Sequence, residues 1–138
     1  MSIELELCEG TGAPEAIVTE EQIAQLVETF YDVARKDDLI GPIFEQHVPD
    51  WDLHMPKMRR FWSSAVLRSG TYSGRPYEAH KAIPGLEQKH FDRWQRLFAE
   101  VTLQVVPEAA SVFQDLGSRM GMSMLARMIA ESDPPEHN

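Results

Sequence analysis

The sequence predicts a single, all-helical domain. Apolar residues recur at intervals of three and four along four segments, which is the spacing that places them on one face of an α-helix. Glycine and proline separate these segments. No segment has the alternating pattern that is typical of a β-strand, and no internal repeat is present. A chain of 138 residues is long enough for one hydrophobic core.

The first predicted helix begins after Thr19 and ends near Lys36. Thr19 has the N-cap position of a capping box, with Gln22 three residues later. The apolar stripe of this helix consists of Ile23, Leu26, Val27, Phe30, Val33 and Ala34. Tyr31 lies one step beside the stripe, so we expect its ring to be buried and its hydroxyl to seek a polar partner.

The middle of the chain is predicted to contain a link and a second helix. Residues 37–44 include Gly41-Pro42 and indicate a turn or a short irregular link, from which Ile43 and Phe44 pack inward. Asp50 is expected to cap the next helix, and Pro56 either begins the main part of it or kinks it. The inward positions of this helix are Met55, Met58, Phe61, Trp62, Ala65 and Val66.

A short helix and two longer ones follow. Residues 69–76 indicate a loop, and Pro76 suits the first position of a short helix that carries His80 and stops at Pro84-Gly85. The next helix has Phe91, Trp94, Leu97, Phe98, Val101 and Val105 on its apolar side. The last opens at Pro107 and has Val112, Phe113, Leu116, Met120, Met124, Leu125 and Met128 on its inner side.

The domain boundaries follow from these patterns. Residues 1–18 contain three helix-breaking residues and no period, so we expect a loose N-terminal arm. The helical domain is predicted to occupy residues 19–131, and residues 132–138 form a polar tail with Pro134-Pro135.

Charge and cysteine content exclude several classes of protein. A net charge of -9 argues against nucleic acid and anionic membrane surfaces as partners, because both call for a basic face. Cys8 is the only cysteine, so no disulfide can form within the chain. The first residues lack the cationic start of a signal peptide, and no apolar run approaches the roughly 20 residues that span a bilayer. We therefore expect a cytoplasmic location.

The titratable residues leave the chemistry open. The five histidines (His47, His54, His80, His90 and His137) have no zinc spacing and form no His-Glu-x-x-His motif. Ser63 and Ser64 lack a nucleophile elbow, and no phosphate-binding glycine loop is present. A heme needs only one strong protein ligand, which suits dispersed histidines. By pattern alone, a lone histidine such as His80 is more often structural or exposed than a metal ligand.

A basic island consists of Lys57, Arg59, Arg60 and Arg68 in an otherwise acidic chain. It suits an anionic small ligand, but a solvated helix face would have the same charges.

Several short segments occur in an order and spacing that resemble one known family. They are Phe30-Tyr31, Leu39 to Phe44, Trp51 followed by His54, Phe61-Trp62, Gly70 to Pro76, His80 with Pro84, and His90 to Trp94 continuing to Leu97-Phe98. Over about residues 20–130 the chain resembles the truncated hemoglobins of group III.

The resemblance implies a globin-like, two-over-two sandwich of four main helices around heme b (iron protoporphyrin IX). It places the proximal iron ligand on His80 and the distal polar groups on Tyr31, His54 and Trp94. Phe44 corresponds to the phenylalanine that packs on the heme plane. The further cofactor contacts expected are Met58, Phe61, Trp62, Tyr72, Ile83 and Phe98.

The resemblance further implies an iron that can take a sixth ligand, with O2, CO or NO as the small ligands. The Tyr31 O–H and the Trp94 N–H are donors for such a ligand. The basic island, with Arg75 or Lys81, is expected to meet the heme propionates. Because Pro56 is close to His54, the distal helix is expected to be frayed there, with His54 as a gate. His90 and His47 are rival iron ligands, and His90 would begin a different helix.

Three functions remain open at this point. The first is an oxygen-binding protein, for transport or as a ligand sensor. The second is a heme-dependent redox enzyme, a nitric oxide dioxygenase or a peroxidase-like protein, which would need an external reductase because the chain has no flavin or nicotinamide domain. The third is a heme-free helical interaction module.

Overall fold

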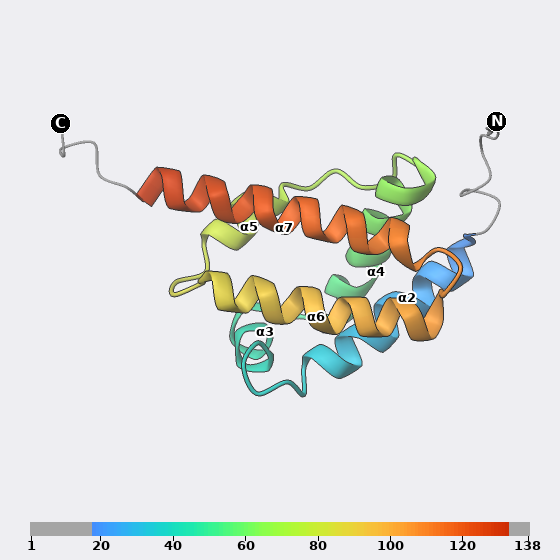
Figure 1. Ribbon diagram of the computed structural model, residues 1–138, viewed down its shortest axis with the longest axis horizontal. Helices are drawn as coiled ribbons and strands as arrows, with labels where there is room; N and C mark the ends of the chain where they lie inside the picture. The colour runs from blue at the N-terminus through green and yellow to red at the C-terminus, as the bar shows by residue number, and fades with distance from the viewer. Residues whose placement is uncertain (1–17, 133–138) are drawn as a thin grey trace.

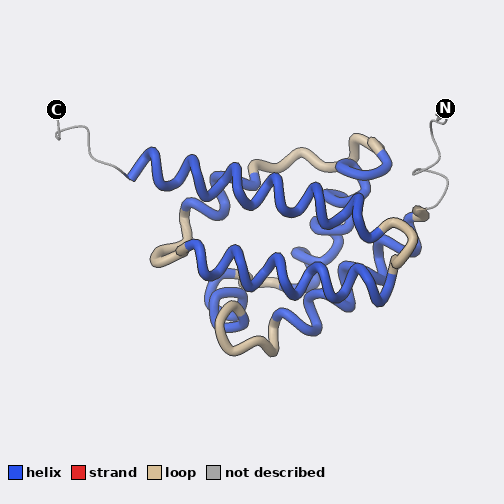
Figure 2. Tube along the Cα trace, viewed as in Figure 1, coloured by secondary structure: helices blue, strands red, loops and turns tan. Residues whose placement is uncertain are grey.

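The structure is a computed structural model, and it describes residues 18–132. The predicted loose arm with Cys8, most of the polar tail and His137 lie outside the described residues. The helices are α2 (Glu20–Ala34), α3 (Gly41–His47), α4 (Trp51–Trp62), the π-helical η1 (Ser63–Leu67), α5 (Pro76–Lys81), α6 (Gln88–Val105) and α7 (Ala110–Ser132). Figure 2 shows only helices and loops within this part of the chain.

Two pairs of helices form the molecule. α2 packs on α4 and on α6, and α6 packs on α7. In Figure 1, α6 and α7 lie side by side along the long axis, with α2 and α4 behind them. This arrangement confirms the predicted all-helical, two-over-two sandwich. No helix among the described residues is long and apolar enough to cross a membrane.

The fully buried core lies where the first half of α2 meets the end of α6 and the beginning of α7. Ile23, Leu26, Phe30, Phe98 and Phe113 are each at most 2% exposed. A fully buried side chain of this size stabilises the fold by roughly 1.5–3 kcal/mol. The core therefore fixes one end of the sandwich independently of the loops at the other end.

The predicted helix starts at Thr19 and Asp50 are confirmed. The Thr19 hydroxyl accepts a hydrogen bond from the Gln22 backbone N–H at 3.1 Å, and the Gln22 side chain accepts one from the Thr19 N–H at 2.9 Å. Asp50 accepts from the Asp52 N–H at 3.0 Å at the start of α4. α2 ends two residues before Lys36, and α7 begins at Ala110, three residues after Pro107.

The link predicted over residues 37–44 is helical from Gly41 onward, so that prediction was wrong for α3. Asp37 accepts hydrogen bonds from the backbone N–H groups of Leu39 (2.9 Å) and Ile40 (3.0 Å), which shapes the turn before the helix. Gly41 lies so close to the end of α2 that a Cβ there would be 2.5 Å from the Arg35 carbonyl oxygen. The turn at Asp37 and the close approach of Gly41 to the end of α2 therefore precede this helix, so Gly41-Pro42 begins it and does not mark a loop.

Pro56 lies inside α4 and does not end it. The helix continues to Trp62 and passes directly into η1, which ends at Arg68 with a left-handed backbone (φ 59°). A π-helical turn inserts extra backbone into a helix and shifts the direction of the residues that follow it. The π-helical segment η1 therefore begins seven residues after Pro56, so the position of the proline does not predict it.

An ion pair joins the turn before α3 to α6. Arg93 Nη1 donates to Asp37 Oδ1 at 2.8 Å, and the Asp37 side chain is only 10% exposed. Burial raises the pKa of the Asp37 carboxyl, but the hydrogen bonds from Ile40, Arg93 and Leu39 together lower it below its usual range. The carboxylate is consequently charged at neutral pH and holds the turn against α6.

We predict that Asp37→Asn lowers the free energy of unfolding by about 1–3 kcal/mol at pH 7, because the variant loses charge-assisted hydrogen bonds. The pKa of Asp37 is lower in the folded chain than the ordinary value of about 3.9. Its stabilisation is therefore fully present above that value and disappears as the pH falls through the lowered pKa. Urea unfolding of both proteins at pH 7 and pH 3 measures the difference.

The matched control is Asp115→Asn, which breaks an exposed ion pair with Arg119 within α7. It should change the stability little at either pH. An Asp37→Asn effect of equal size at pH 3 and pH 7 would contradict the assigned role of the carboxylate.

Candidate functional site

The Tyr31 side chain lies in a cage of aromatic rings. Its ring centroid is 5.2 Å from that of Phe30, 5.5 Å from Phe44, 5.7 Å from Trp51 and 5.2 Å from His54, in edge-on contacts. The residue is 8% exposed, and burial raises the pKa of its hydroxyl. The phenol is therefore neutral and its O–H makes no hydrogen bond within residues 18–132. It is a fixed donor available to a ligand.

His54 brings a second polar atom to the same place. Its ring lies edge-on to Tyr31 and to Trp51, each at 5.2 Å. Burial, followed by the charge of Lys57, lowers the pKa of the His54 imidazole, so the ring is neutral near pH 7. Among the buried side-chain polar atoms of the described residues, Nε2 of His54 alone has no hydrogen-bond partner. Such an atom costs free energy unless a ligand or water satisfies it.

The Trp94 ring is one end of a stack of aromatic rings that extends into the core. It stacks on Phe98 at 4.7 Å, and Phe98 stacks on Trp62 at 5.0 Å. Phe30 meets Trp94 edge-on at 5.2 Å, which connects the stack to the neighbour of Tyr31. Gly117 of α7 allows the close approach, since a Cβ there would be 3.1 Å from the Trp94 ring.

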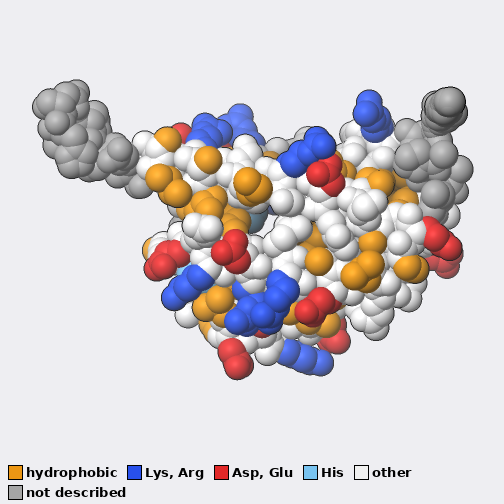
Figure 3. Space-filling model, viewed as in Figure 1, with side chains coloured by type: hydrophobic (Ala, Val, Ile, Leu, Met, Phe, Trp, Pro, Cys, Tyr) orange, Lys and Arg blue, Asp and Glu red, His pale blue; other side chains and the backbone are white. Residues whose placement is uncertain are grey.

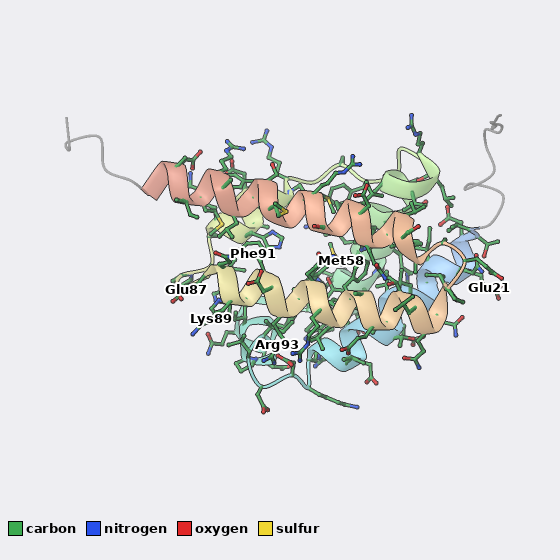
Figure 4. The ribbon with its side chains drawn as sticks, in the orientation of Figure 1. Glu21, Met58, Glu87, Lys89, Phe91 and Arg93 are labelled. Atoms are coloured by element: carbon green, nitrogen blue, oxygen red, sulfur yellow. The ribbon has the colours of Figure 1, made fainter. Side chains whose placement is uncertain are left out.

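The expected cofactor contacts divide into two groups. Trp62 and Phe98 are buried in the core beneath Trp94, whereas the others keep part of their surface exposed: Phe44, Met58, Phe61, Tyr72 and Ile83. In Figure 4, Met58 and Phe91 are directed into the region between α6 and α7. Figure 3 shows hydrophobic side chains gathered below α7 on the left of the molecule. We call this half-exposed group the apolar wall; within it, Phe61 and Tyr72 contact each other edge-on.

Tyr72 is held in this wall by its surroundings. Its ring lies edge-on to Phe61 at 5.1 Å, and its backbone N–H donates to the Ser64 hydroxyl at 2.9 Å. The ring lies directly over Gly74, where a Cβ would overlap the Tyr72 hydroxyl. The loop before α5 therefore has a defined conformation.

His80 lies on α5 and is partly buried. Its Nδ1 is 2.7 Å from the Pro76 carbonyl oxygen, an acceptor, so Nδ1 is the nitrogen that carries the hydrogen. Nε2 of the neutral ring then keeps a free lone pair, which is the form in which histidine binds a metal. The ring of Phe91 lies 6.4 Å away and flanks it.

The rival histidines differ from His80 in this respect. Nδ1 of His90 accepts a hydrogen bond from the Glu87 N–H at 2.9 Å at the beginning of α6, which leaves the hydrogen of the neutral ring on Nε2. His47 is exposed in the last turn of α3. Neither residue has the combination of partial burial and a free Nε2 lone pair.

Two surface grooves are present among the described residues, and one of them reaches the site. One, of about 700 Å³, reaches the Tyr31 ring between α2, α3 and α4 and has Arg35 stacked 4.1 Å over Trp51 on its wall. The other, of about 420 Å³, is lined by Arg59 and Arg60 of the basic island together with Glu20, Pro56, Ser63 and Thr71. Lys57 and Arg68 of the island are outside this lining, and Arg75 is exposed before α5.

Two residues beside the site were not singled out from the sequence as functional. Trp51 contacts both Tyr31 and His54, and its position three residues before His54 in one helix was a usable signal. Phe91 was identified only as an apolar helix position, and nothing local indicates that it faces His80.

The arrangement fits a heme. His80 lies on α5 with its Nδ1 hydrogen-bonded to a carbonyl oxygen, and the Tyr31 hydroxyl and the unpartnered Nε2 of His54 come from α2 and α4. Phe44 lies edge-on to Tyr31, and it keeps part of its surface exposed. Porphyrin is large and apolar with a metal that needs one protein ligand, which these groups match.

Known proteins with similar sequences and structures support this interpretation. The chain is 33% identical to the group 3 truncated hemoglobin ctb of Campylobacter jejuni, over 75% of this chain and 94% of that protein. The crystal structure of a group III truncated hemoglobin from Campylobacter jejuni superposes with a TM-score of 0.76 and 30% identity, covering 80% of this chain and 91% of that one. No family model matches the chain. The identity and the coverage show that this chain belongs to the group 3 truncated hemoglobins, a family of heme globins.

Proposed function

We propose that this chain binds heme b through Nε2 of His80 and holds O2, CO or NO reversibly on the Tyr31 side. The observation that carries the proposal is the hydrogen bond from His80 Nδ1 to the Pro76 carbonyl, 2.7 Å long. It fixes the tautomer and the orientation of the ring, as partners of metal-bound histidines do. Reversible binding of this kind is what oxygen transport requires.

Heme would supply an iron atom that His80 would hold and that could bind a diatomic ligand. The chain's own contribution on the second side is a set of three polar groups: the Tyr31 O–H, the Trp94 Nε1–H and His54 Nε2. A bound ligand that carries partial negative charge would accept charge-assisted hydrogen bonds from the donors in this set. Tyr31 and His54 are held by edge-on aromatic contacts, so little entropy is lost when they engage a ligand.

The apolar wall has a separate role. Phe44, Met58, Phe61 and Ile83, which keep part of their surface exposed, would supply apolar surface for the porphyrin and exclude water from the site. Exclusion of water strengthens the hydrogen bonds that Tyr31 and Trp94 donate, because the local dielectric constant falls.

We predict that the purified chain, mixed with hemin, develops the intense Soret absorption of a bound heme, and that His80→Ala changes the spectrum by removing the axial nitrogen. His90→Ala and His47→Ala are the matched controls, because neither ring offers a free Nε2 lone pair in a partly buried position. Their spectra should match that of the unchanged chain.

Two results would overturn the proposal. A chain that develops no Soret band with hemin is not a heme protein in this form. A spectrum that survives in His80→Ala but is lost in His90→Ala would move the iron ligand to α6.

We further predict that Tyr31→Phe raises the oxygen dissociation rate by about ten- to a hundredfold. A hydrogen bond to a charged acceptor contributes about 1.5–3 kcal/mol, and each 1.4 kcal/mol is a factor of ten. The ring contacts of Tyr31 remain in the variant, so the change isolates the hydroxyl. Stopped-flow displacement of oxygen measures the rate.

Carbon monoxide dissociation from the same variant is the internal control, since bound CO has little negative charge and should respond far less. Trp94→Phe and His54→Leu extend the comparison to the other polar groups. An oxygen dissociation rate unchanged in Tyr31→Phe would show that Tyr31 is not the main donor.

A further inference from the structure

Burial of side chains does not explain what holds α5 in position. It has six residues, and none of them is buried. A helix of this length is unstable in water by itself. Burial of apolar surface, which holds α2 and α6 in place, contributes little here. The position of His80 must therefore depend on other contacts of α5, and α7 is the helix on which α5 mainly packs.

Four side chains supply such contacts, two from α5 and two from the last part of α7. The Tyr77 hydroxyl donates to Glu131 Oε1 at 2.7 Å, and Lys81 Nζ lies 3.2 Å from the same oxygen. Arg127 Nε donates to Glu131 Oε2 at 3.1 Å, and its guanidinium lies 4.0 Å over the Tyr77 ring. Both carboxylate oxygens are thus used, and two of the three donors come from α5.

The spacing of these residues places them around His80. Tyr77 is three residues before His80 and Lys81 is the next residue after it. Tyr77 and Lys81 are one helical turn apart, as are Arg127 and Glu131, so each pair lies on one side of its helix. The two contacts to Glu131 therefore restrict both the rotation of α5 about its axis and its distance from α7.

The carboxylate is charged under all ordinary conditions. The hydrogen bonds from Tyr77, Lys81 and Arg127 lower the pKa of the Glu131 carboxyl to about 2. The ion pair of Asp115 with Arg119 (2.7 Å) also joins exposed side chains, but both of its residues belong to α7. Glu131 differs from such surface pairs because it connects two elements.

We propose that Glu131 is a positioning residue for His80, which it orients by holding α5 through Tyr77 and Lys81. The inference deepens the proposed function, since it assumes that His80 is the iron ligand. Glu131 itself touches neither His80 nor a ligand. Its effect passes through the orientation of the short helix, and thus through the direction of His80 Nε2.

The test compares Glu131→Ala, Tyr77→Phe and the control Asp115→Ala in the full-length chain, with and without hemin. Amide hydrogen exchange reports on residues 76–82. With hemin, the iron–histidine stretching band in the resonance Raman spectrum of the ferrous form and the rate of hemin transfer to apomyoglobin report on the axial bond. Glu131→Gln is the conservative variant, because its amide oxygen can still accept from Tyr77.

We expect Glu131→Ala to accelerate exchange in residues 76–82 and hemin loss by about three- to tenfold, the size expected when two or three exposed polar contacts are removed. The iron–histidine band should shift or broaden. Tyr77→Phe should show the same change in part, and Glu131→Gln should restore most of the original behaviour. Asp115→Ala should change none of these.

Exchange in α5 and an iron–histidine band that are the same in Glu131→Ala as in Asp115→Ala would overturn the proposal. So would a loss of protection spread over all helices, since that would make Glu131 a residue of general stability. The chain could take up no hemin while Glu131→Ala still accelerates amide exchange in α5 alone. In that case the proposed function fails, but the link from Glu131 to α5 stands.

Discussion

The stack of Trp62, Phe98 and Trp94 is the contact on which the rest of the site depends. It joins α4 to α6, and Phe30 joins it edge-on from α2 through Phe98 (5.3 Å) and Trp94 (5.2 Å). Each aromatic pair contributes about 0.5–1.5 kcal/mol beyond the burial of its surface. Because the same rings form the core and support Trp94, the fold and the orientation of this donor cannot change separately.

Different kinds of interaction hold the residues on the two sides of the site. On the Tyr31 side, edge-on aromatic contacts and burial hold the polar groups, so their geometry is rigid and insensitive to salt. On the His80 side, α5 has no buried residue and depends on charged and polar contacts to α7. Exposed ion pairs are screened by salt. A shift in the position of His80 therefore costs less free energy than a shift in the position of Tyr31.

Local patterns predicted a large part of this structure. The capping box at Thr19 and the apolar stripe that follows identified α2, and the place of Tyr31 beside the stripe predicted its buried ring. α3 was missed because Gly41-Pro42 by itself indicates a turn, whereas the turn lies at Asp37 and Gly41 packs closely against the end of α2 where the helix begins. Glu131 was missed because Tyr77 is 54 residues away in the sequence. His80 was predicted as the iron ligand from the family resemblance alone, and its bond to Pro76 is visible only in three dimensions.

The crystal structure of the full-length chain loaded with hemin tests the central claim most directly. Anomalous scattering at the iron edge locates the metal without reference to the protein. The account predicts an iron atom bonded to Nε2 of His80, with Nδ1 still donating to the Pro76 carbonyl and the Tyr31 hydroxyl on the opposite face of the porphyrin. Iron bonded to His90 or His47, or a porphyrin outside the region between α5 and Tyr31, would contradict it.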